Sequence, residues 1–332
     1  MTTPEKALVA PKNLSCEEIA ALLSSGDEGL WRETFAAARE VKAKVGKTAV
    51  LPRGLIECSN VCAKDCLYCG IRRGNAKAAR YRIPEREVLA CVEEARRRGY
   101  PAVAFQAGEI ESEANTAYYE RLLAGCGGLE VTLSLGEQEE SVYRRWKDAG
   151  AMRYLIRIET SNRELYGRIH PKDCSFARRI ECIRTLKRLG YVTGTGVMVG
   201  LPGQTVGDLA RDIVFYGEEN VDMVGMGPYI PHADTPLGRA GISDFKSQIS
   251  YGGVKLALRM IALTRLYLHD VNIVAATALE ALDPEGGRQR GIDAGANVIM
   301  PVLTPARYRC GYDLYPGKVD LQPEACNLEP ET

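Results

Sequence analysis

Short apolar segments typical of β-strands alternate with amphipathic helical segments along most of this chain, and this alternation limits the possible folds. Eight strands separated by helices of about ten to fifteen residues are typical of a parallel sheet with helical crossovers. We therefore predict an α/β fold, a (β/α)8 TIM-type barrel, with a doubly wound open sheet as the alternative. The strand candidates are residues 50–58, 102–106, 131–135, 153–158, 194–199, 223–226, 273–276 and 297–300, and the main helix candidates are 84–98, 139–149, 176–189, 206–218 and 255–268.

The length of 332 residues suits one barrel of about 250 residues with smaller parts at its ends. A capping box, Ser15-Cys16-Glu17-Glu18, opens an amphipathic helix that continues through Leu23, and a second helix candidate runs from about Leu30 to Lys44. We expect a helical N-terminal extension over residues 1–48, the barrel over residues 49–306, and a C-terminal tail over residues 307–332 that packs over the barrel top.

Composition argues against several classes of partner and reaction. Lys plus Arg and Asp plus Glu number 43 each, which gives no electrostatic reason to expect nucleic acid or an anionic membrane as a partner. No run of eighteen apolar residues could span a membrane, and the first residues lack the pattern of a signal peptide. Eleven cysteines without such a signal indicate a reducing cytoplasm. Three scattered histidines and the lack of a Gly-x-Ser-x-Gly motif give no support to hydrolytic catalysis.

Four cysteines lie within twelve residues, from Cys58 to Cys69. Cys62, Cys66 and Cys69 have the spacing C-x3-C-x2-C, and Tyr68 directly precedes the last of them. Three thiolates so close along one loop can bind three irons of an iron–sulfur cluster, and the fourth iron then stays open to a small ligand. The sequence therefore predicts a cluster that can pass an electron to a chelating molecule.

A structural zinc site with Cys58 as its fourth ligand is the alternative for this segment. Such sites usually combine two cysteine pairs separated by a longer stretch, whereas these four cysteines are continuous. Cys58 ends a strand candidate in which alternate residues share a face. We interpret it as a small buried residue and leave open whether it contacts the active site.

The cysteine spacing, with an aromatic residue before the last cysteine, resembles the signature of radical S-adenosylmethionine (SAM) enzymes. The resemblance implies a [4Fe–4S] cluster held by Cys62, Cys66 and Cys69, with S-adenosyl-L-methionine chelating the open iron beside Tyr68. In that superfamily one electron cleaves the sulfonium of the cofactor and yields a 5′-deoxyadenosyl radical. An exposed low-potential cluster of this kind suits an anaerobic or microaerobic cell.

Two later segments place polar residues at the ends of strand candidates. In Gln106-Ala107-Gly108-Glu109 the glycine lets the backbone approach a ligand and the carboxylate can accept hydrogen bonds from an ammonium group. A plain strand-ending turn is the alternative there. In Arg157-Ile158-Glu159 the two charged residues share one face of the strand, where they must pair with each other or bind a ligand.

Longer segments resemble one family in particular, the [FeFe]-hydrogenase maturases HydE. The likeness runs from about Val50 to Lys318, and biotin synthase and methylornithine synthase are similar but more distant. The family takes part in building the diiron active site of the hydrogenase. Besides the cysteine loop, the matching segments are Thr132–Glu137, Val197–Thr205, Asp222–Leu237, Gly295–Pro301 and Leu314–Lys318.

This resemblance implies a complete barrel of the radical SAM kind, with the cluster and cofactor at the top and a long internal cavity. It also assigns residues by motif. The residues implied in cofactor binding are Tyr68, Gln106, Gly108, Glu109, Arg157, Glu159, Arg179 and Met198, and those implied in the substrate cavity are Thr132, Ser134, Ile158, Thr277, Met300 and Tyr308.

The chain departs from the HydE pattern at positions that bear on substrate and cofactors. Ile158 stands where the pattern has His, and Val274-Ala275-Ala276-Thr277 stands where it has Pro-Ala-Thr-Thr, so the substrate could differ. The second-cluster motif of many members, C-x7-C-x2-C, is replaced by Asp320, Cys326 and Glu329. One thiolate cannot hold a [2Fe–2S] cluster, so we expect no second cluster.

We therefore predict a cytoplasmic radical SAM enzyme of the HydE type that acts on a small molecule or an iron complex inside the barrel. A flavodoxin or ferredoxin is the expected reductant, and the other hydrogenase maturases are further candidate partners. Two alternatives stay open. One is a radical SAM mutase or sulfur-transfer enzyme related to methylornithine synthase or biotin synthase, and the other is a non-catalytic iron–sulfur electron carrier.

Overall fold

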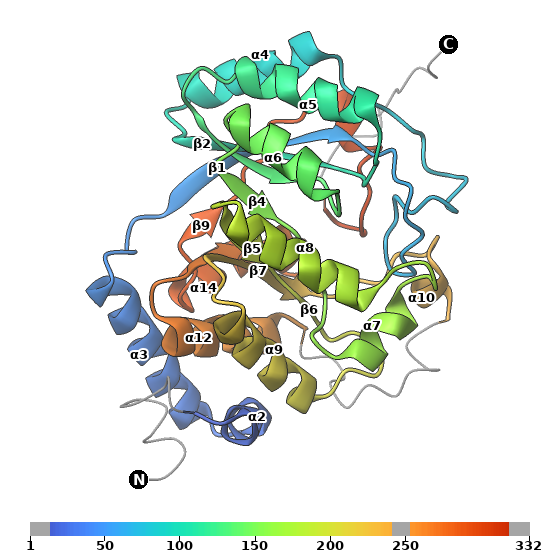
Figure 1. Ribbon diagram of the computed structural model, residues 1–332. Coiled ribbons are helices and arrows are strands. Elements are labelled where there is room, and N and C mark those ends of the chain that lie inside the picture. Colours follow the sequence, from blue (N-terminus) through green and yellow to red (C-terminus); the bar gives the residue numbers. More distant parts are fainter. Residues whose placement is uncertain (1–13, 241–252, 319–332) are drawn as a thin grey trace.

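The computed structural model describes residues 14–240 and 253–318, which form a closed parallel barrel surrounded by helices (Figure 1). The strand order is β5-β4-β3-β2-β1-β9-β8-β7-β6, and a further pairing of β5 with β7 closes the ring. The predicted (β/α)8 barrel is confirmed, and the open-sheet alternative is wrong. The strands are β1 Leu51–Ser59, β2 Ala102–Ala107, β3 Glu130–Ser134, β4 Arg153–Leu155, β5 Val192–Thr195, β6 Met198–Val199, β7 Met223–Pro228, β8 Asn272–Ala275 and β9 Val298–Ile299.

The helices predicted from apolar periodicity occur within two residues of their expected bounds. These are α2 Cys16–Ser24, α3 Glu28–Lys44, α4 Glu85–Arg97, α6 Glu140–Asp148, α8 Phe176–Arg188, α9 Val206–Glu218 and α12 Gly253–Leu268. Helix α5, Glu113–Ala124, escaped prediction because it buries Asn115 and Thr116 along with its apolar residues, which blurs the periodic pattern. The shorter helices are α7 Arg163–Ile169, α10 Pro236–Arg239, α13 Thr277–Leu282, α14 Gly287–Asp293 and α15 Ala306–Arg309.

Two strands are shorter than the sequence predicts. The strand expected over residues 153–158 ends at Leu155, because the chain then turns into a left-handed conformation at Glu159, with φ of 64°. The strand expected over residues 194–199 is divided into β5 and β6, which both pair with β7. At the division, a Cβ on Gly196 would lie 1.7 Å from the carbonyl oxygen of Gly225, so the two backbones approach more closely than another residue permits.

The N-terminal helices pack on the outside of the barrel, α2 against α9 and α3 against α12 (Figure 1). The capping box at Ser15 is present, and Arg259 of α12 lies 4.3 Å from the ring centroid of Trp31 in α3. None of the helices within the described ranges is long and apolar enough to cross a membrane. We keep the division into 1–48, 49–306 and 307–332 as a proposal, and residues 1–13 and 319–332 of its end segments lie outside the described residues.

At the amino-terminal end of the barrel strands, the fully buried Arg265 holds together the loops that enter β8 and β9. Its guanidinium donates to the carbonyl oxygens of Gly295 at 3.0 Å, Val271 at 2.8 Å and His269, and to Oδ1 of Asn297 at 3.0 Å. Burial lowers the pKa of Arg265 to about 10, so the side chain stays charged at neutral pH. One cation therefore satisfies four acceptors.

Replacing Arg265 with Met should lower the free energy of unfolding by about 3 kcal/mol or more, because the acceptors would lose their donor. Chemical denaturation followed by circular dichroism measures the change. Arg144→Met is the control, since Arg144 pairs with Glu140 on the exposed face of α6 and should contribute less than about 0.5 kcal/mol. Similar small changes in both variants would contradict the role given to Arg265.

Candidate active site

A cavity of about 310 Å³ lies inside the barrel, beside the loops that follow strands β1 to β4. Its volume falls in the range of small-molecule sites, roughly 300–1,000 Å³. Most residues predicted for the site share this one space although they come from distant parts of the sequence. The predicted residues that line it are Cys62, Cys66, Tyr68, Cys69, Gln106, Gly108, Glu109, Thr132, Ser134, Arg157, Glu159, Arg179, Met198, Thr277 and Met300.

The loop that carries the cysteines lies directly against the loop after β2. A Cβ on Gly108 would lie 2.2 Å from the carbonyl oxygen of Val61 and 2.7 Å from the Cβ of Cys62, so only glycine allows this contact. The backbone N–H of Glu109 donates to Sγ of Cys62 at 3.3 Å. Hydrogen bonds of this kind on cysteine sulfurs tune the potential of iron–sulfur clusters. The arrangement around Cys62 therefore fits a cluster ligand.

The cysteines suit a cluster better than a single ion. Across residues 14–240 and 253–318, no three Cys, His, Asp or Glu side chains converge closely enough to hold one metal ion. The cysteine sulfurs that bind a cluster lie farther apart than those that bind one ion, because each sulfur bonds to a different iron. Cys58 is fully buried in β1, with its thiol near the carbonyl oxygen of Ile56 and the thiols of Cys91 and Cys126. The zinc alternative, with Cys58 as fourth ligand, has no support in this geometry.

The surroundings of the three thiols keep them protonated in the absence of iron. Burial raises the pKa of Cys62, and it raises that of Cys69 to about 12. Hydrogen bonding with the thiol of Cys174, together with burial, raises the pKa of Cys66 well above its ordinary value. Because iron binds the thiolate, loading of a cluster must release protons.

Glu109 presents a buried carboxylate to the cavity. The Lys64 ammonium lies 3.1 Å from its Oε1, yet that oxygen has no aligned hydrogen-bond donor among the described residues. Burial raises the pKa of the Glu109 carboxyl, while the nearby Arg179 lowers it. A Cβ on Gly136 would lie 2.1 Å from Oε2, so a glycine is needed there to admit the carboxylate. A carboxylate oxygen can accept more than one donor, so Oε1 could also receive a second ammonium group, such as that of methionine.

Arg157 and Glu159 line the cavity as an ion pair, with Nη2 of the arginine 2.9 Å from Oε2 of the glutamate. The left-handed backbone of Glu159 costs a non-glycine residue about 1 kcal/mol or more. Two hydrogen bonds hold this turn: Glu159 N–H donates to Gly196 at 3.0 Å, and Met198 N–H donates to Glu159 at 3.1 Å. The strained conformation therefore places the Glu159 carboxylate with fixed geometry.

Asp212 of α9 supports the same turn from the side away from the cavity. It is fully buried, and it accepts hydrogen bonds at 2.6 Å from both the backbone N–H and the hydroxyl of Ser161. Burial raises the pKa of Asp212 to about 7, while the bonds from Ser161 lower it. Sequence reasoning missed this residue because α9 gives no sign that one of its acidic side chains faces inward.

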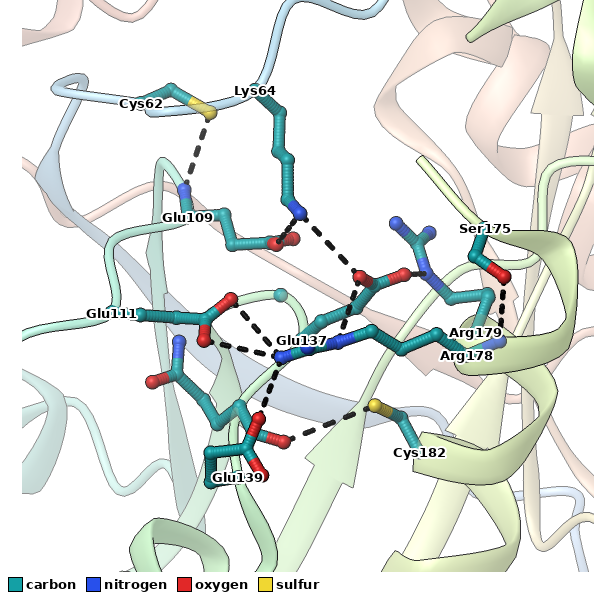
Figure 2. Close-up of polar contacts among 12 residues, drawn as sticks. Cys62, Lys64, Glu109, Glu111, Glu137, Glu139, Ser175, Arg178, Arg179 and Cys182 are labelled. Atoms are coloured by element: carbon teal, nitrogen blue, oxygen red, sulfur yellow. Dashed lines mark hydrogen bonds and ion pairs between the residues drawn. The ribbon is translucent and has the colours of Figure 1, made fainter. Parts of the chain in front are cut away.

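Glu137, in the loop after β3, is the centre of a buried charge network (Figure 2). Its side chain is 1% exposed and accepts a hydrogen bond from Nε of Arg179 at 2.7 Å, while Nε of Arg178 and Nζ of Lys64 each lie 3.5 Å away. Arg179 also donates to the carbonyl oxygen of Arg157. The network joins loops that follow β1, β3 and β4 to the start of α8.

The last described segment closes over the cavity through a second buried ion pair that the sequence did not indicate. Lys318 pairs with Glu57 of β1, and the two side chains are 4% and 0% exposed. Lys318 also donates to the carbonyl oxygen of Tyr312 at 3.2 Å, and the hydroxyls of Tyr315 and Thr277 lie 2.6 Å apart. Tyr312, Tyr315 and Lys318 all line the cavity.

Two residues predicted for the substrate cavity do not line it. Ile158 lies between Arg157 and Glu159 and faces the opposite side, where it is fully buried in the apolar core. Tyr308, in α15, packs its ring on Tyr81 with centroids 5.1 Å apart. These placements correct both predictions. The sequence did not show that the Ile158 side chain faces the core, and it did not show how the short helix α15 is oriented.

The inner wall is largely apolar and holds few polar groups. Met198 and Met300 lie in this wall with the hydroxyls of Thr132 and Ser134. The Thr132 hydroxyl is buried with no hydrogen-bond partner among the described residues, so it is available to a ligand. Ala276, one of the departures from the HydE pattern, also lines the cavity. The positions that correspond to the second-cluster motif of other members, residues 320–329, lie outside the described residues, so the expectation of no second cluster stays a prediction.

Comparison with known proteins agrees with this geometry. The model of the radical SAM superfamily matches residues 56–215. The chain is 44% identical to the [FeFe] hydrogenase maturase subunit HydE of Thermotoga maritima over 309 residues, which are 91% of this chain and 84% of that protein. It is 25% identical to 3-methylornithine synthase of Methanosarcina acetivorans over 299 residues, 87% of this chain and 80% of that protein.

Solved structures show the same fold. A methylornithine synthase, PylB, aligns with a TM-score of 0.78 at 23% identity and covers 92% of this chain and 87% of its own. The [FeFe]-hydrogenase maturase HydG also aligns with a TM-score of 0.78, at 20% identity, over 95% of this chain and 72% of its own.

A barrel of this fold with three cysteines at its rim is a radical SAM enzyme, a class that uses a [4Fe–4S] cluster and S-adenosylmethionine. The electron-carrier alternative is thereby excluded. Within the superfamily, the chain belongs to the HydE family of [FeFe]-hydrogenase maturases.

The buried Asp212 should make stability depend on pH. Its folded pKa of about 7 lies above the ordinary value of 3.8, so its stabilising contribution is complete below pH 4 and is lost as the pH rises through 7. Between pH 5 and pH 8 the free energy of unfolding of the wild type should fall by about 2–3 kcal/mol relative to that of Asp212→Asn. Urea denaturation at several pH values measures this, and parallel pH profiles would contradict it.

The Lys318–Glu57 pair should behave as one unit. Lys318→Met should lower the free energy of unfolding by about 3 kcal/mol, because Glu57 would remain buried without a counter-charge. Adding Glu57→Gln should recover most of the loss. Thermal and chemical denaturation of the single and double variants test this, and a double variant as unstable as Lys318→Met would show that the pair does not anchor the segment.

Proposed function

We propose that this protein cleaves S-adenosylmethionine reductively and acts on a small molecule or iron complex during assembly of the diiron site of [FeFe] hydrogenase. One observation carries the proposal. Three cysteines and a buried carboxylate suited to an ammonium group face one cavity, in a chain 44% identical to HydE over 91% of its length.

We propose a role for each group, and its place in the cavity supports that role. Cys62, Cys66 and Cys69 would hold three irons of the cluster, and Glu109 would accept the methionine ammonium. When bound, the cluster and cofactor supply one-electron cleavage of the sulfonium, which yields a 5′-deoxyadenosyl radical. Arg157 and Glu159 offer a cation and an acceptor for the remaining polar groups of the cofactor.

Further roles are proposed for residues that line the same cavity. Gln106 and Gly108, at the end of β2, would border the methionine part of the cofactor, and Tyr68 would pack beside the cluster. Arg179 would bind cofactor polar groups while it holds Glu137. Met198 would contact the cofactor, and the proposed substrate contacts are Thr132, Ser134, Thr277 and Met300.

The position of the cavity inside the barrel supports chemistry in which contact with water is reduced. The barrel surrounds it, and Tyr312, Tyr315 and Lys318 cover it from the C-terminal side. These walls would shield a bound substrate from part of the solvent. The volume of about 310 Å³ admits a small substrate and no folded protein.

The cluster also requires a source of electrons, for which we propose a flavodoxin or ferredoxin. The other hydrogenase maturases are proposed partners because HydE of Thermotoga maritima, which is 44% identical to this chain, is a maturase subunit. Reduced thiols and such electron carriers are both found in the cytoplasm, where we place the protein. Balanced charge continues to argue against nucleic acid and anionic membranes as partners.

Anaerobically reconstituted protein should form 5′-deoxyadenosine and methionine from S-adenosylmethionine when a reductant is present. Replacing Cys62, Cys66 or Cys69 with Ala should each abolish this product, because the cluster would lose a ligand. Cys58→Ala is the matched control and should keep both iron and activity, since Cys58 is part of β1 and its side chain is fully buried in the apolar core. Iron analysis and chromatography give the two readouts.

A maturation assay then separates the proposed role from that of the mutase relatives. The wild type, mixed with the other maturases and apo-hydrogenase, should restore hydrogen production, and Cys66→Ala should not. Cofactor cleavage without any maturation would favour a methylornithine synthase-like or biotin synthase-like reaction.

A further inference from the structure

Lys64 is the middle residue between Cys62 and Cys66, and its side chain reaches carboxylates on two neighbouring loops (Figure 2). Its Nζ lies 3.1 Å from Oε1 of Glu109 and 3.5 Å from Oε2 of Glu137. The Lys64 side chain is only 19% exposed. Charge attraction is less weakened by water at such a site than at the surface.

Glu137 gives Lys64 a fixed point of attachment. Its carboxylate is buried and also held by Arg179 and Arg178, both in the first turn of α8. Arg179 is fixed in turn by its hydrogen bond to the carbonyl oxygen of Arg157. Movement of Glu137 would therefore disturb two arginines and the loop after β4.

The other contacts of residues 63 and 65 reach the loop after β2 or stay within the cysteine loop itself. The Ala63 N–H donates to the carbonyl oxygen of Glu109 at 2.8 Å. Asp65 pairs with Arg72 at 2.6 Å, and Arg72 lies in the same excursion of the chain after β1. Lys64 instead extends to the loop after β3.

We propose that Lys64 is a positioning residue that fastens the cluster loop to the buried Glu137 and so keeps Cys62 and Cys66 placed for the cluster. The ammonium has no lone pair, so Lys64 does not bind iron itself. This inference rests on the proposed function, since it takes these cysteines as cluster ligands.

The test compares the rate at which a ferrous chelator removes iron from reconstituted wild type, Lys64→Met and Lys64→Arg. Methionine keeps the apolar length of the side chain and removes the charge. Lys64→Met should lose iron about tenfold faster, which corresponds to about 1.4 kcal/mol, because the two buried carboxylates would lose the Lys64 charge. Lys64→Arg should stay within about twofold of the wild type because it retains the cation. Paramagnetic resonance of the reduced cluster should show a broadened or shifted signal in Lys64→Met alone.

Lys77→Met is the matched control for charge removal near the same loop. Lys77 pairs with Asp234 at 2.6 Å but is 72% exposed, so its loss should leave iron release unchanged. Thermal unfolding of each variant without iron shows whether the fold itself has been weakened. An equal loss of iron in Lys64→Met and Lys77→Met would overturn the proposal.

A double variant tests whether Lys64 acts through Glu137. If the contact between them is what holds the loop, Lys64→Met combined with Glu137→Gln should lose iron no faster than the faster single variant. If the double variant instead loses iron at a rate increased by the product of the two single effects, Lys64 and Glu137 act independently, which would contradict the inference. A wild type that holds no cluster, or a Cys66→Ala variant that holds one, would instead contradict the proposed function. If the wild type holds a cluster and Cys66→Ala does not, but Lys64→Met releases iron at the wild-type rate, only the role given to Lys64 would be contradicted.

Discussion

Closure of the parallel barrel between β5 and β7 determines where the site can lie. Because the barrel strands run in one direction, their carboxyl ends meet at a single rim, and the loops after β1, β2, β3 and β4 must face one another there. The cysteine loop, the Glu109 carboxylate and the Arg157–Glu159 turn are brought together by this geometry alone. In an open sheet the loops after β1 and β4 would still lie along one edge, but they would be three strand positions apart instead of curving toward a common centre.

Charge pairing then fixes the loops at that rim. Burying an ionised group is unfavourable unless a group of opposite charge compensates it. The main buried charges of the rim have such partners, either on another loop or two residues away in the same loop. Glu137 is compensated by Lys64 and two arginines, Glu57 by Lys318, and Glu159 by Arg157. The pairs of Glu137 and Glu57 join separate segments of the rim, and separating the partners of any of these pairs would leave a buried charge uncompensated.

The local sequence pattern was sufficient to predict helices with a strong apolar periodicity. It was also sufficient for the cysteines, whose spacing along the chain indicates their chemistry. Helix α9 lies where the apolar pattern placed it, and the three cysteines share the cavity. The prediction failed at Ile158, because a shift of one residue along an extended segment turns a side chain to the opposite side. It also failed for α5, because this helix buries polar residues. Lys64, Glu137 and Lys318 were missed because a charged residue in a loop gives no local sign of burial.

The sequence by itself determined the barrel, through alternating strands and helices, and the cluster chemistry, through three closely spaced thiols. Both are local properties, since periodicity and short spacing act within a few residues. The tertiary structure alone decided which charges are buried and which partners they have. Glu57 and Lys318 are separated by 261 positions yet form one ion pair. Such a pairing depends on how the closed barrel orients its loops, which no local pattern encodes.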